Sequence, residues 1–248
     1  MNVQMKIQLA GQVFLIQCRH PLVENRFRGY ESKDMDGIPI CIHECDLAYE
    51  RDKSIREAQL ERIQPIAYPE EYLEFVAIQR KIAEELFRYD TLLFHGSVVA
   101  VDGVGYLFTA KSGTGKSTHT RLWREVFGDR AVMVNDDKPF LKITENGVYA
   151  CGSPWNGKHG LGTNITVPLK AICILDRGEE NEIHPITPQE ALLMLFQQSN
   201  RPQDPQKMPQ YLTLLDKLAA QTSFYHLHCN MTPEAAITAH RGMCGGQR

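Results

Sequence analysis

The chain has 248 residues, enough for one large α/β domain with a sizeable core or for a catalytic domain with a small appendage. Its 27 Lys and Arg against 30 Asp and Glu leave a formal charge of −3, so we expect no nucleic-acid partner. Seven cysteines, an odd number, and the lack of a secretory-type apolar segment predict a reduced, cytoplasmic protein. Charges interrupt the apolar runs before they reach the length of a membrane span, so we expect no membrane partner.

Residues 1–68 are predicted to be a β-rich N-terminal region. Residues 5–16 alternate around a glycine, which is typical of a hairpin, and residues 38–43 form another short strand. This region is a candidate for binding a peptide partner, and our hypothesis is that the peptide docks along a sheet edge. From 69 to 89 the apolar residues recur at helical spacing and predict a helix that leads into the core.

Residues 69–248 are predicted to form a core that contains a phosphate-binding loop, an α/β fold whose mixed sheet is flanked by helices. The pattern predicts strands at 91–101, 104–110, 131–135, 140–143, 148–151, 169–175, 181–186 and 224–229. It predicts helices at 116–127, from 188 to about 198, near 205–220 and from 232. Thr187-Pro-Gln-Glu190 reads as a capping box that starts the second of these helices.

The most informative segment is Gly105–Thr118, with the sequence GYLFTAKSGTGKST. An apolar strand, a glycine-bearing turn and a Lys-Ser pair opening a helix predict a phosphate-binding loop, in which Lys116 reaches the β- and γ-phosphates and Ser117 ligates Mg²⁺. Ala110 stands where the G-x-x-x-x-G-K-[ST] pattern has its first glycine, and it is still small. The predicted nucleotide-binding residues are Ser112, Gly113, Thr114, Gly115, Lys116, Ser117 and Thr118.

Two carboxylates follow the next predicted strand. Val132-Met-Val-Asn135 runs into Asp136-Asp137, and such a strand usually lies beside the strand of the phosphate loop, where a carboxylate reaches the metal. Neighbouring residues on a strand point to opposite faces, so the two carboxylates can differ in role. One could hold Mg²⁺ while the other accepts a proton from the attacking hydroxyl. A solvated turn before Pro139 is the alternative.

A predicted hairpin places a second loop beside these carboxylates. If Asn146-Gly147 is a two-residue turn, Glu145 pairs with Val148. When this register is extended along both strands away from the turn, it sets the glycine-rich loop 152–160 beside Asp137. The candidates there for contacting phosphate or substrate are Trp155, Asn156 and Lys158, with ordinary surface-loop residues as the alternative.

A second hairpin, turning at Asp102-Gly103, sets His95 opposite Ala110, where the strand opens into the predicted loop. His95 could orient or stabilise a phosphate oxygen there, and a structural histidine is the alternative. Arg201 is a further candidate for stabilising phosphate, with a surface charge as the alternative. Cys41-Ile-His-Glu-Cys45 and His226-Leu-His-Cys229 lack a paired C-x-x-C unit, so we interpret both as packed strand residues rather than zinc ligands.

His95-Gly96, Ser112–Ser117 and Asp136-Asp137 occur in the order and near the spacing of the catalytic histidine, phosphate loop and aspartate pair of the HPr kinase/phosphorylase family. The chain resembles that family and, more distantly, the ATP-dependent phosphoenolpyruvate carboxykinases, which share a related nucleotide-binding core. The resemblance implies that Asp137 is the base for a serine hydroxyl and that Asp136 lies near the metal.

The chain is most similar to HPr-kinase-like proteins found beside peptide-modification systems, including lasso-peptide kinases that phosphorylate a serine of a precursor peptide. Ser117–Trp123, Asn135–Pro139 and Gly152–Gly157 look like that subgroup. The resemblance covers roughly residues 70–240.

The chain also departs from the larger families. Thr118 stands where HPr kinases carry an acidic residue, and neither their N-terminal domain nor the C-terminal helix that contacts HPr can be identified. The resemblance therefore implies an acceptor other than HPr. The oxaloacetate site of the carboxykinases is absent too, which argues against decarboxylation.

We therefore expect a kinase that uses ATP and Mg²⁺ to phosphorylate a hydroxyl, by resemblance a serine, of a peptide or small protein. The predicted catalytic residues are His95, Lys116 and Asp137, and the predicted metal ligands are Ser117 and Asp136. A kinase of small hydroxylated molecules and a nucleotide-sensing module without transfer are the alternatives. The sequence leaves open whether the chain forms a homo-oligomer.

Overall fold

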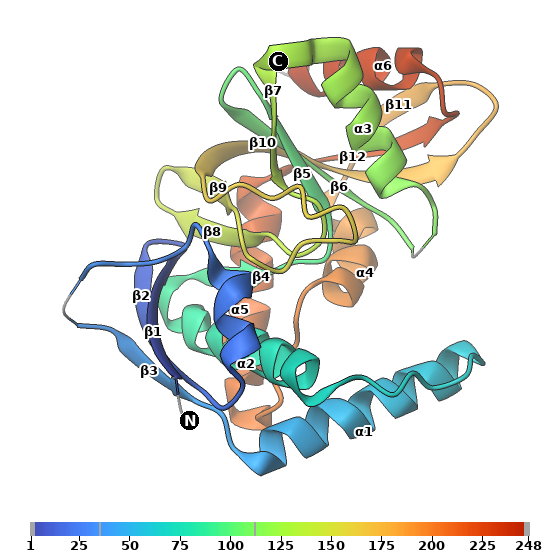
Figure 1. Ribbon diagram of the computed structural model, residues 1–248. Helices are drawn as coiled ribbons and strands as arrows, with labels where there is room; N and C mark the ends of the chain where they lie inside the picture. The colour runs from blue at the N-terminus through green and yellow to red at the C-terminus, as the bar shows by residue number, and fades with distance from the viewer. Residues whose placement is uncertain (1–2, 35, 112, 246–248) are drawn as a thin grey trace. The chain divides into compact units, whose positions relative to one another are not determined.

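The structure is a computed structural model that describes residues 3–34, 36–111 and 113–245 (Figure 1). The chain divides into two compact units, Met1–Glu85 and Leu86–Arg248. Across the described ranges, none of the helices combines the length and the apolar character needed to cross a membrane.

The first unit contains the predicted hairpin. Strands β1 (Val3–Leu9) and β2 (Gln12–Cys18) pair antiparallel, so that Leu9 faces Gln12. The two turn residues between them have φ of 50° and 81°, the left-handed conformation that a two-residue hairpin turn with matching twist requires. The short helix η1 (Pro21–Phe27) follows, and β3 (Ile38–Cys41) then pairs parallel to β2.

The prediction that the N-terminal region is β-rich was wrong for its second half, which is the helix α1 (Glu44–Glu61). Most of its side chains are charged or polar, so no apolar stripe marks the helical period. Side-chain bonds stabilise it instead. The Asp46 carboxylate accepts the His43 N–H at 2.9 Å in a capping box, and helix α2 (Glu70–Leu86) contributes an arginine that pairs with α1.

The edges of the three-stranded sheet are partly occupied. Along β1, Gln8 N–H donates to the Tyr30 carbonyl and Ser32 N–H donates to the Lys6 carbonyl. Strand β3 contains Pro39, which has no N–H, and the carbonyl of its last residue accepts Lys81 Nζ at 2.7 Å. These contacts disfavour our hypothesis that a peptide adds as a strand here, because few main-chain groups are left to pair.

The second unit is built on a nine-stranded sheet in the described residues. Its strands are β4 (Thr91–Leu93), β5 (Ser97–Val101), β6 (Val104–Thr109), β7 (Ala131–Asn135), β8 (Phe140–Thr144), β9 (Gly147–Cys151), β10 (Thr166–Arg177), β11 (Glu182–Ile186) and β12 (Ser223–Cys229). The order is β4-β8-β9-β10-β6-β5-β7, with β12 also on β10 and β11 on β12. The start of β10 pairs antiparallel with β9, and its later part pairs parallel with β6 and β12.

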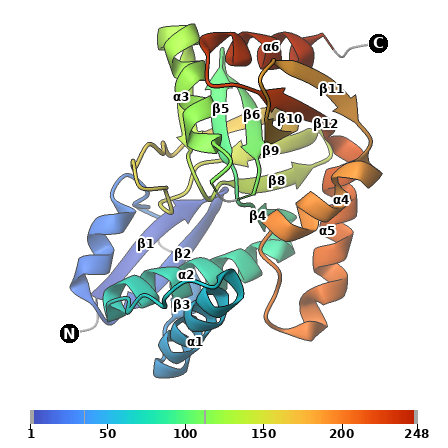
Figure 2. The same cartoon turned by 90° about the vertical axis from the view of Figure 1, so that its right-hand side faces the viewer.

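Helices cover both faces of this sheet (Figure 2). Helices α3 (Lys116–Phe127) and α6 (Pro233–Cys244) bury Trp123 and Met243 against one face. Helices α4 (Pro188–Gln198) and α5 (Met208–Gln221) bury Leu195 and Tyr211 against the other. Three short helices complete the unit: η2 (Phe87–Tyr89), η3 (Gly128–Arg130) and η4 (Pro205–Lys207).

Several predicted elements of this unit are confirmed. Helix α3 and strand β7 have the predicted bounds. The capping box at α4 is present, with the Thr187 side chain accepting Glu190 N–H and the Glu190 carboxylate accepting Thr187 N–H. The hairpin between β5 and β6 has the predicted register, with Val101 opposite Val104.

The predicted strand 91–101 is instead two strands, because the backbone leaves the sheet at residues 94–96. There, three consecutive N–H groups donate to two distant segments: Phe94 to the Pro139 carbonyl and Gly96 to the Asp137 carbonyl after β7, and His95 to the Gln198 carbonyl. Strand β4 consequently pairs with β8, whereas β5 pairs with β6 and β7. Strand β7 therefore does not lie beside β6 as predicted, since β5 lies between them.

The predicted register of the β8–β9 hairpin was also wrong. Thr144 faces Gly147, so the turn is Glu145-Asn146 and the pairing is displaced from the predicted one. The Thr144 hydroxyl accepts Asn146 N–H at 3.1 Å and donates to the Gly147 carbonyl at 2.9 Å, which stabilises the turn at Glu145-Asn146. Gly147 has a φ of 118°, a conformation that glycine adopts readily. The ladder ends at Phe140 opposite Cys151, before it reaches Asp137.

Candidate functional site

The predicted phosphate loop lies at the carboxyl edge of β6, where the chain turns into α3. Ser112 lies outside the described residues. Gly113 and Gly115 have φ of 77° and 126°, so a side chain at either position would be strained. Arg177, at the end of β10, holds this turn from outside: its Nη2 donates to the Gly113 carbonyl at 2.6 Å and its Nε to the Thr114 carbonyl at 3.3 Å.

The turn ends in a helix start suited to an anion. Helix α3 begins at Lys116, and Gly115 at its N-cap provides no side-chain cap. The first N–H groups of a helix have no partner within the helix, and the helix dipole is positive there. Lys116 is half-buried, with its Nζ donating to the Ala110 carbonyl at 3.2 Å, whereas Ser117 is exposed and Thr118 is half-buried.

His95 and Asp137 form a pair beside this turn, with His95 Nε2 3.2 Å from Asp137 Oδ1. The backbone break before β5 carries His95 here, and Asp137 follows β7. The hydrogen bond to Asp137 raises the pKa of His95, but burial together with Lys138 and Lys116 outweighs it and leaves that pKa below its ordinary value. The imidazole is therefore neutral at physiological pH.

The pKa of Asp137 is also lowered. Burial raises it, but the hydrogen bond from His95 and the charges of Lys138, His95 and Lys116 outweigh burial. Burial lowers the pKa of Lys116, and Asp137 opposes part of that shift. The structure thus brings together a neutral imidazole, an ionised carboxylate and a lysine, as the sequence predicted for His95, Asp137 and Lys116.

Asn135 organises the turn that carries the aspartates, although no role was predicted for it. Its Oδ1 accepts the N–H groups of Asp137 and Lys138 at 2.8 and 2.6 Å. Its Nδ2 donates to the Ser153 carbonyl at 3.0 Å and to Asn156 Oδ1 at 3.1 Å. The residue is fully buried at the end of β7. An amide directly before a pair of acids is the signal that could have identified it.

Asp136 has a different environment from Asp137. It is 6% exposed, and its Oδ1 accepts Gly157 N–H at 2.7 Å. The loop 152–160 therefore does lie beside the acidic pair, although it folds back by this bond and not by the predicted strand register. Mg²⁺ prefers oxygen ligands and is usually held by one or two carboxylates together with substrate phosphates. The oxygen donors predicted to hold the metal, the Ser117 hydroxyl and the Asp136 carboxylate, are of the type that Mg²⁺ requires.

The other candidates of this loop differ in exposure. Trp155 is buried and packs edge-on against Phe140, with ring centroids 6.2 Å apart. Asn156 is half-buried and engaged with Asn135, and Lys158 is exposed. Only Lys158 of the three has an exposed side chain to offer a ligand in this conformation.

Arg201 is exposed, and its guanidinium lies 5.1 Å from the centroid of the Phe196 ring of α4. The chain next to it pairs with β4, since Asn200 N–H donates to the Leu93 carbonyl. The described contacts of Arg201 are thus with α4 and not with the predicted loop.

A cavity of about 420 Å³ opens on the side of the predicted loop away from Asp137. It is bounded by the turn 113–115, by α3 and by the ends of β10 and β12. Buried His119 forms part of its wall, with its Nε2 accepting the Trp123 indole N–H at 3.0 Å. This cavity was not predicted, because no local signal connects segments so distant in sequence.

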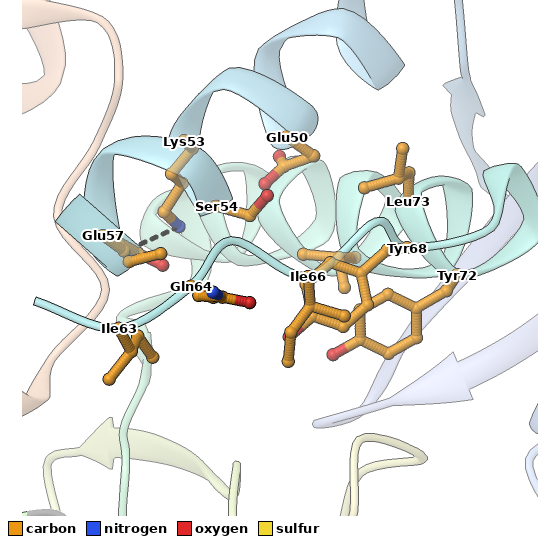
Figure 3. Close-up of a pocket in the computed structure, with 12 residues that line it drawn as sticks. Glu50, Lys53, Ser54, Glu57, Ile63, Gln64, Ile66, Tyr68, Tyr72 and Leu73 are labelled. Carbon is orange, nitrogen blue, oxygen red and sulfur yellow. Dashed lines mark ion pairs between the residues drawn. The ribbon is translucent and has the colours of Figure 1, made fainter. Parts of the chain in front are cut away.

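The first unit has a separate groove of about 210 Å³ between α1, the segment 63–68 and α2 (Figure 3). Tyr68 and Tyr72 stack beside it with centroids 4.7 Å apart. Its charged residues are engaged with other side chains: Lys53 pairs with Glu57, and Glu50 pairs with an arginine of α2. The groove therefore lacks the free acid, base or cation of a reaction centre.

The segments first considered for zinc lie apart from this site. Cys45 is in α1 and not in a strand as predicted, whereas Cys41 ends β3. His226 on β12 contacts the Asp176 carboxylate, with Nε2 2.8 Å from Oδ2. Throughout the described residues, no group of three or more His, Cys, Asp or Glu is arranged to hold a metal ion.

Fold and site together define a mixed α/β protein with a candidate phosphate-handling centre at the carboxyl edge of its sheet. The family model of the SynChlorMet cassette protein ScmC matches residues 67–233, more than half of the chain, and the chain belongs to this family.

No curated protein matches the chain. Among solved structures, the Hpr(Ser) kinase/phosphatase from Coxiella burnetii is similar, with 14% sequence identity and a TM-score of 0.36 over 62% of this chain and 99% of that chain. At this TM-score the likeness supports no conclusion about fold or activity.

Proposed function

We propose that the chain is a kinase that uses ATP and Mg²⁺ to phosphorylate a serine hydroxyl of a peptide or small protein. The observation that carries the proposal is the His95–Asp137 pair, which lies beside the glycine-bearing turn and near Lys116. Phosphoryl transfer needs mainly positioning and charge neutralisation, together with a group that takes the hydroxyl proton. The three residues meet those requirements.

In this proposal Lys116 and the first N–H groups of α3 hold the β- and γ-phosphates. Asp137 accepts the hydroxyl proton as the oxygen attacks the γ-phosphorus, and the bond from that phosphorus to the β-γ bridging oxygen breaks to release ADP. His95 donates a hydrogen bond to Asp137 and orients it. Ser117 and Asp136 would hold Mg²⁺, which neutralises phosphate charge when bound.

A peptide acceptor is supported by the sequence resemblance of Ser117–Trp123, Asn135–Pro139 and Gly152–Gly157 to kinases of peptide-modification systems. The exposed Lys158, on the loop bonded to Asp136, offers a cation on the acceptor side of the site. The acceptor would approach from this side, because the cavity lies on the other side of β6.

The proposal is tested by transfer of labelled phosphate from ATP to a serine-containing precursor peptide encoded beside the gene. Asp137→Asn removes the base but keeps a hydrogen-bond partner for His95, so transfer should fall at least about 100-fold while nucleotide affinity changes little. Lys116→Ala should lose nucleotide binding itself. Asp129→Asn, an exposed aspartate on η3, is the matched control and should behave as wild type.

Three outcomes would redirect the assignment. Nucleotide binding without acceptor-dependent transfer in wild type, over peptides and small hydroxylated molecules alike, would indicate a sensor. Transfer to small molecules alone would replace the acceptor class. Loss of Mg²⁺-ATP binding in Asp137→Asn would exchange the roles given to the two aspartates.

A further inference from the structure

We propose that the cavity between α3 and the ends of β10 and β12 is the nucleoside compartment of this site, and that it accepts different bases with little discrimination. The inference rests on the proposed function, since it assumes that the turn at 113–117 holds the phosphates. It adds the location of the base and ribose and the chemistry that selects them.

The order of the strands gives the direction in which the nucleotide lies. Strand β6 carries the turn, β5 and β7 lie on one side of it, and β10 and β12 lie on the other. Asp137 follows β7 and His95 precedes β5, so the transferred phosphoryl group belongs on that side. The leaving nucleotide extends the opposite way in an in-line transfer. That direction leads past Thr118 into the cavity.

The size and the lining of the cavity suit a base and ribose. Its volume of about 420 Å³ is within the range of small-ligand pockets, roughly 300–1,000 Å³. Leu122, Leu175 and Met231 provide apolar contact, and Cys229 also lines the cavity. Met231 is 77% exposed, so this flexible side chain is free to close over a bound ring.

The charged and amide side chains of the lining are engaged elsewhere. The Asp176 carboxylate contacts His226 at 2.8 Å, and the Asn230 amide donates to the Glu179 carbonyl at 2.9 Å. Arg177 donates to the carbonyls of the loop, and His119 accepts the Trp123 indole N–H. These bonds hold the four side chains to other parts of the protein, and the rest of the lining is mostly glycine and apolar residues. Selection therefore rests on shape and apolar contact, which discriminate weakly between purines.

Cys229 offers a reporter for occupancy of the cavity, because this half-buried thiol lines it. Burial raises its pKa, so it should alkylate slowly. The experiment measures iodoacetamide labelling of Cys229 by peptide mass spectrometry, with no ligand, with tripolyphosphate or with ATP, each with Mg²⁺. We expect ATP to protect Cys229 at least about fivefold and tripolyphosphate to protect it little, because only ATP carries a nucleoside.

A pair of variants checks the assignment by affinity. Cys229→Phe fills the cavity, so the affinity for ATP should fall roughly tenfold or more. The affinity for tripolyphosphate should stay within about twofold of wild type. Met231→Ala changes an exposed side chain, so it tests the contact of Met231 with the bound ring without risk to folding. The affinity for ATP should fall by a few-fold. Cys45→Phe, at an exposed position in α1, is the control and should change neither ligand. In wild type, ATP and GTP should bind within about tenfold of each other.

The outcomes separate this inference from the function on which it rests. If tripolyphosphate and ATP bind with equal affinity to wild type and Cys229→Phe weakens neither, the nucleoside lies elsewhere and the compartment is overturned while the phosphate site stands. If neither ligand binds wild type, the proposed nucleotide site fails and the compartment fails with it. A preference for one purine above about 100-fold would overturn the claim of weak discrimination.

Discussion

His95 and Asp137 illustrate how burial and neighbouring charges together set protonation at a single pair. Both pKa values are lowered, so the pair is a neutral imidazole that donates a hydrogen bond to a carboxylate, and not an ion pair of imidazolium and carboxylate. The nearby cations Lys116 and Lys138 enforce this state, because each opposes a proton on His95 and favours ionised Asp137. A carboxylate in this setting remains ready to accept a proton at neutral pH.

The first prediction at residue scale concerns the pH dependence of transfer. The pKa of His95 is below its ordinary 6.5, so the rate should be flat from about pH 8 to 6.5 and fall only at lower pH, as His95 gains a proton. Asp137, whose pKa is below its ordinary 3.8, titrates at still lower pH. His95→Asn keeps an N–H donor without titrating, and its rate profile should lack that decline. An acid limb retained in the variant would assign it to another group.

His119 gives a prediction about stability. Burial lowers its pKa to about 3, so below pH 6.5 the unfolded chain takes up a proton that the folded chain refuses. Because the unfolded state binds more protons, the free energy of unfolding should fall as pH falls from about 6.5 toward 3, by up to about 1.4 kcal/mol per pH unit.

The comparison variant is His119→Gln, which can still accept the Trp123 indole N–H but does not titrate. Urea unfolding of both proteins at pH 7.0 and 5.0 measures the difference. Wild type should lose more stability than the variant on acidification, and equal losses would show that the folded protein accommodates a charged His119.

At the scale of elements, α1 shows a helix held by charge pairs. Arg80 of α2 donates from Nε to Glu50 at 2.6 Å and from Nη2 to Asp46 at 3.0 Å, and all three side chains are at most 10% exposed. Removal of Arg80 would leave two buried carboxylates without this partner. Arg80→Met should therefore lower the free energy of unfolding by about 3–5 kcal/mol.

The control for this prediction lies on α1, the helix that carries the two carboxylates. Lys53 and Glu57 form an exposed pair at 4.0 Å (Figure 3), and Lys53→Met should change stability by less than about 0.5 kcal/mol. Thermal or urea unfolding compares the two variants. Equal small effects would mean that Asp46 and Glu50 find other partners or protons when Arg80 is lost.

The elements that could be predicted are those with local signals. Helix α3, strand β7 and the capping box of α4 are each encoded within a few consecutive residues. Helix α1 could not be found by apolar periodicity, since most of its side chains are charged or polar. Two of its acidic residues pair with Arg80, which lies on another helix, so no local pattern reveals that contact. The split of 91–101 depends on acceptors at Pro139 and Gln198, far along the chain, which no local pattern reveals.

The position of a candidate residue could be predicted where a short hairpin set the register. The two-residue turn at Asp102-Gly103 placed His95 by the predicted loop, and the structure agrees. The second hairpin was misjudged because the Thr144 hydroxyl selects a different turn. Asp136 still meets the loop 152–160, but through Gly157 N–H, a contact that depends on how an irregular loop folds.

At the scale of the whole molecule, the described residues of the candidate site all belong to the unit Leu86–Arg248. The division between the units falls in the last turn of α2. The first unit has its own sheet, its own helix pair and its own groove (Figures 1 and 3). Binding of the acceptor by residues 1–68 stays a prediction, with the partly occupied sheet edges directing attention to other surfaces of that unit.

The departure of the backbone at residues 94–96 has a consequence for how related sequences can vary. Main-chain groups alone make its three bonds, to the carbonyls of Pro139, Gln198 and Asp137. The side chain at Gln198 can therefore vary without removing the bond to His95 N–H, whereas Phe94 is constrained by its own burial in the core. Asp137, the other member of the pair, is held by the side-chain amide of Asn135, and few residues can replace that amide. Among related sequences we expect more variation at residue 198 than at Asn135. The geometry of the His95–Asp137 pair should therefore be retained even where overall sequence identity is low.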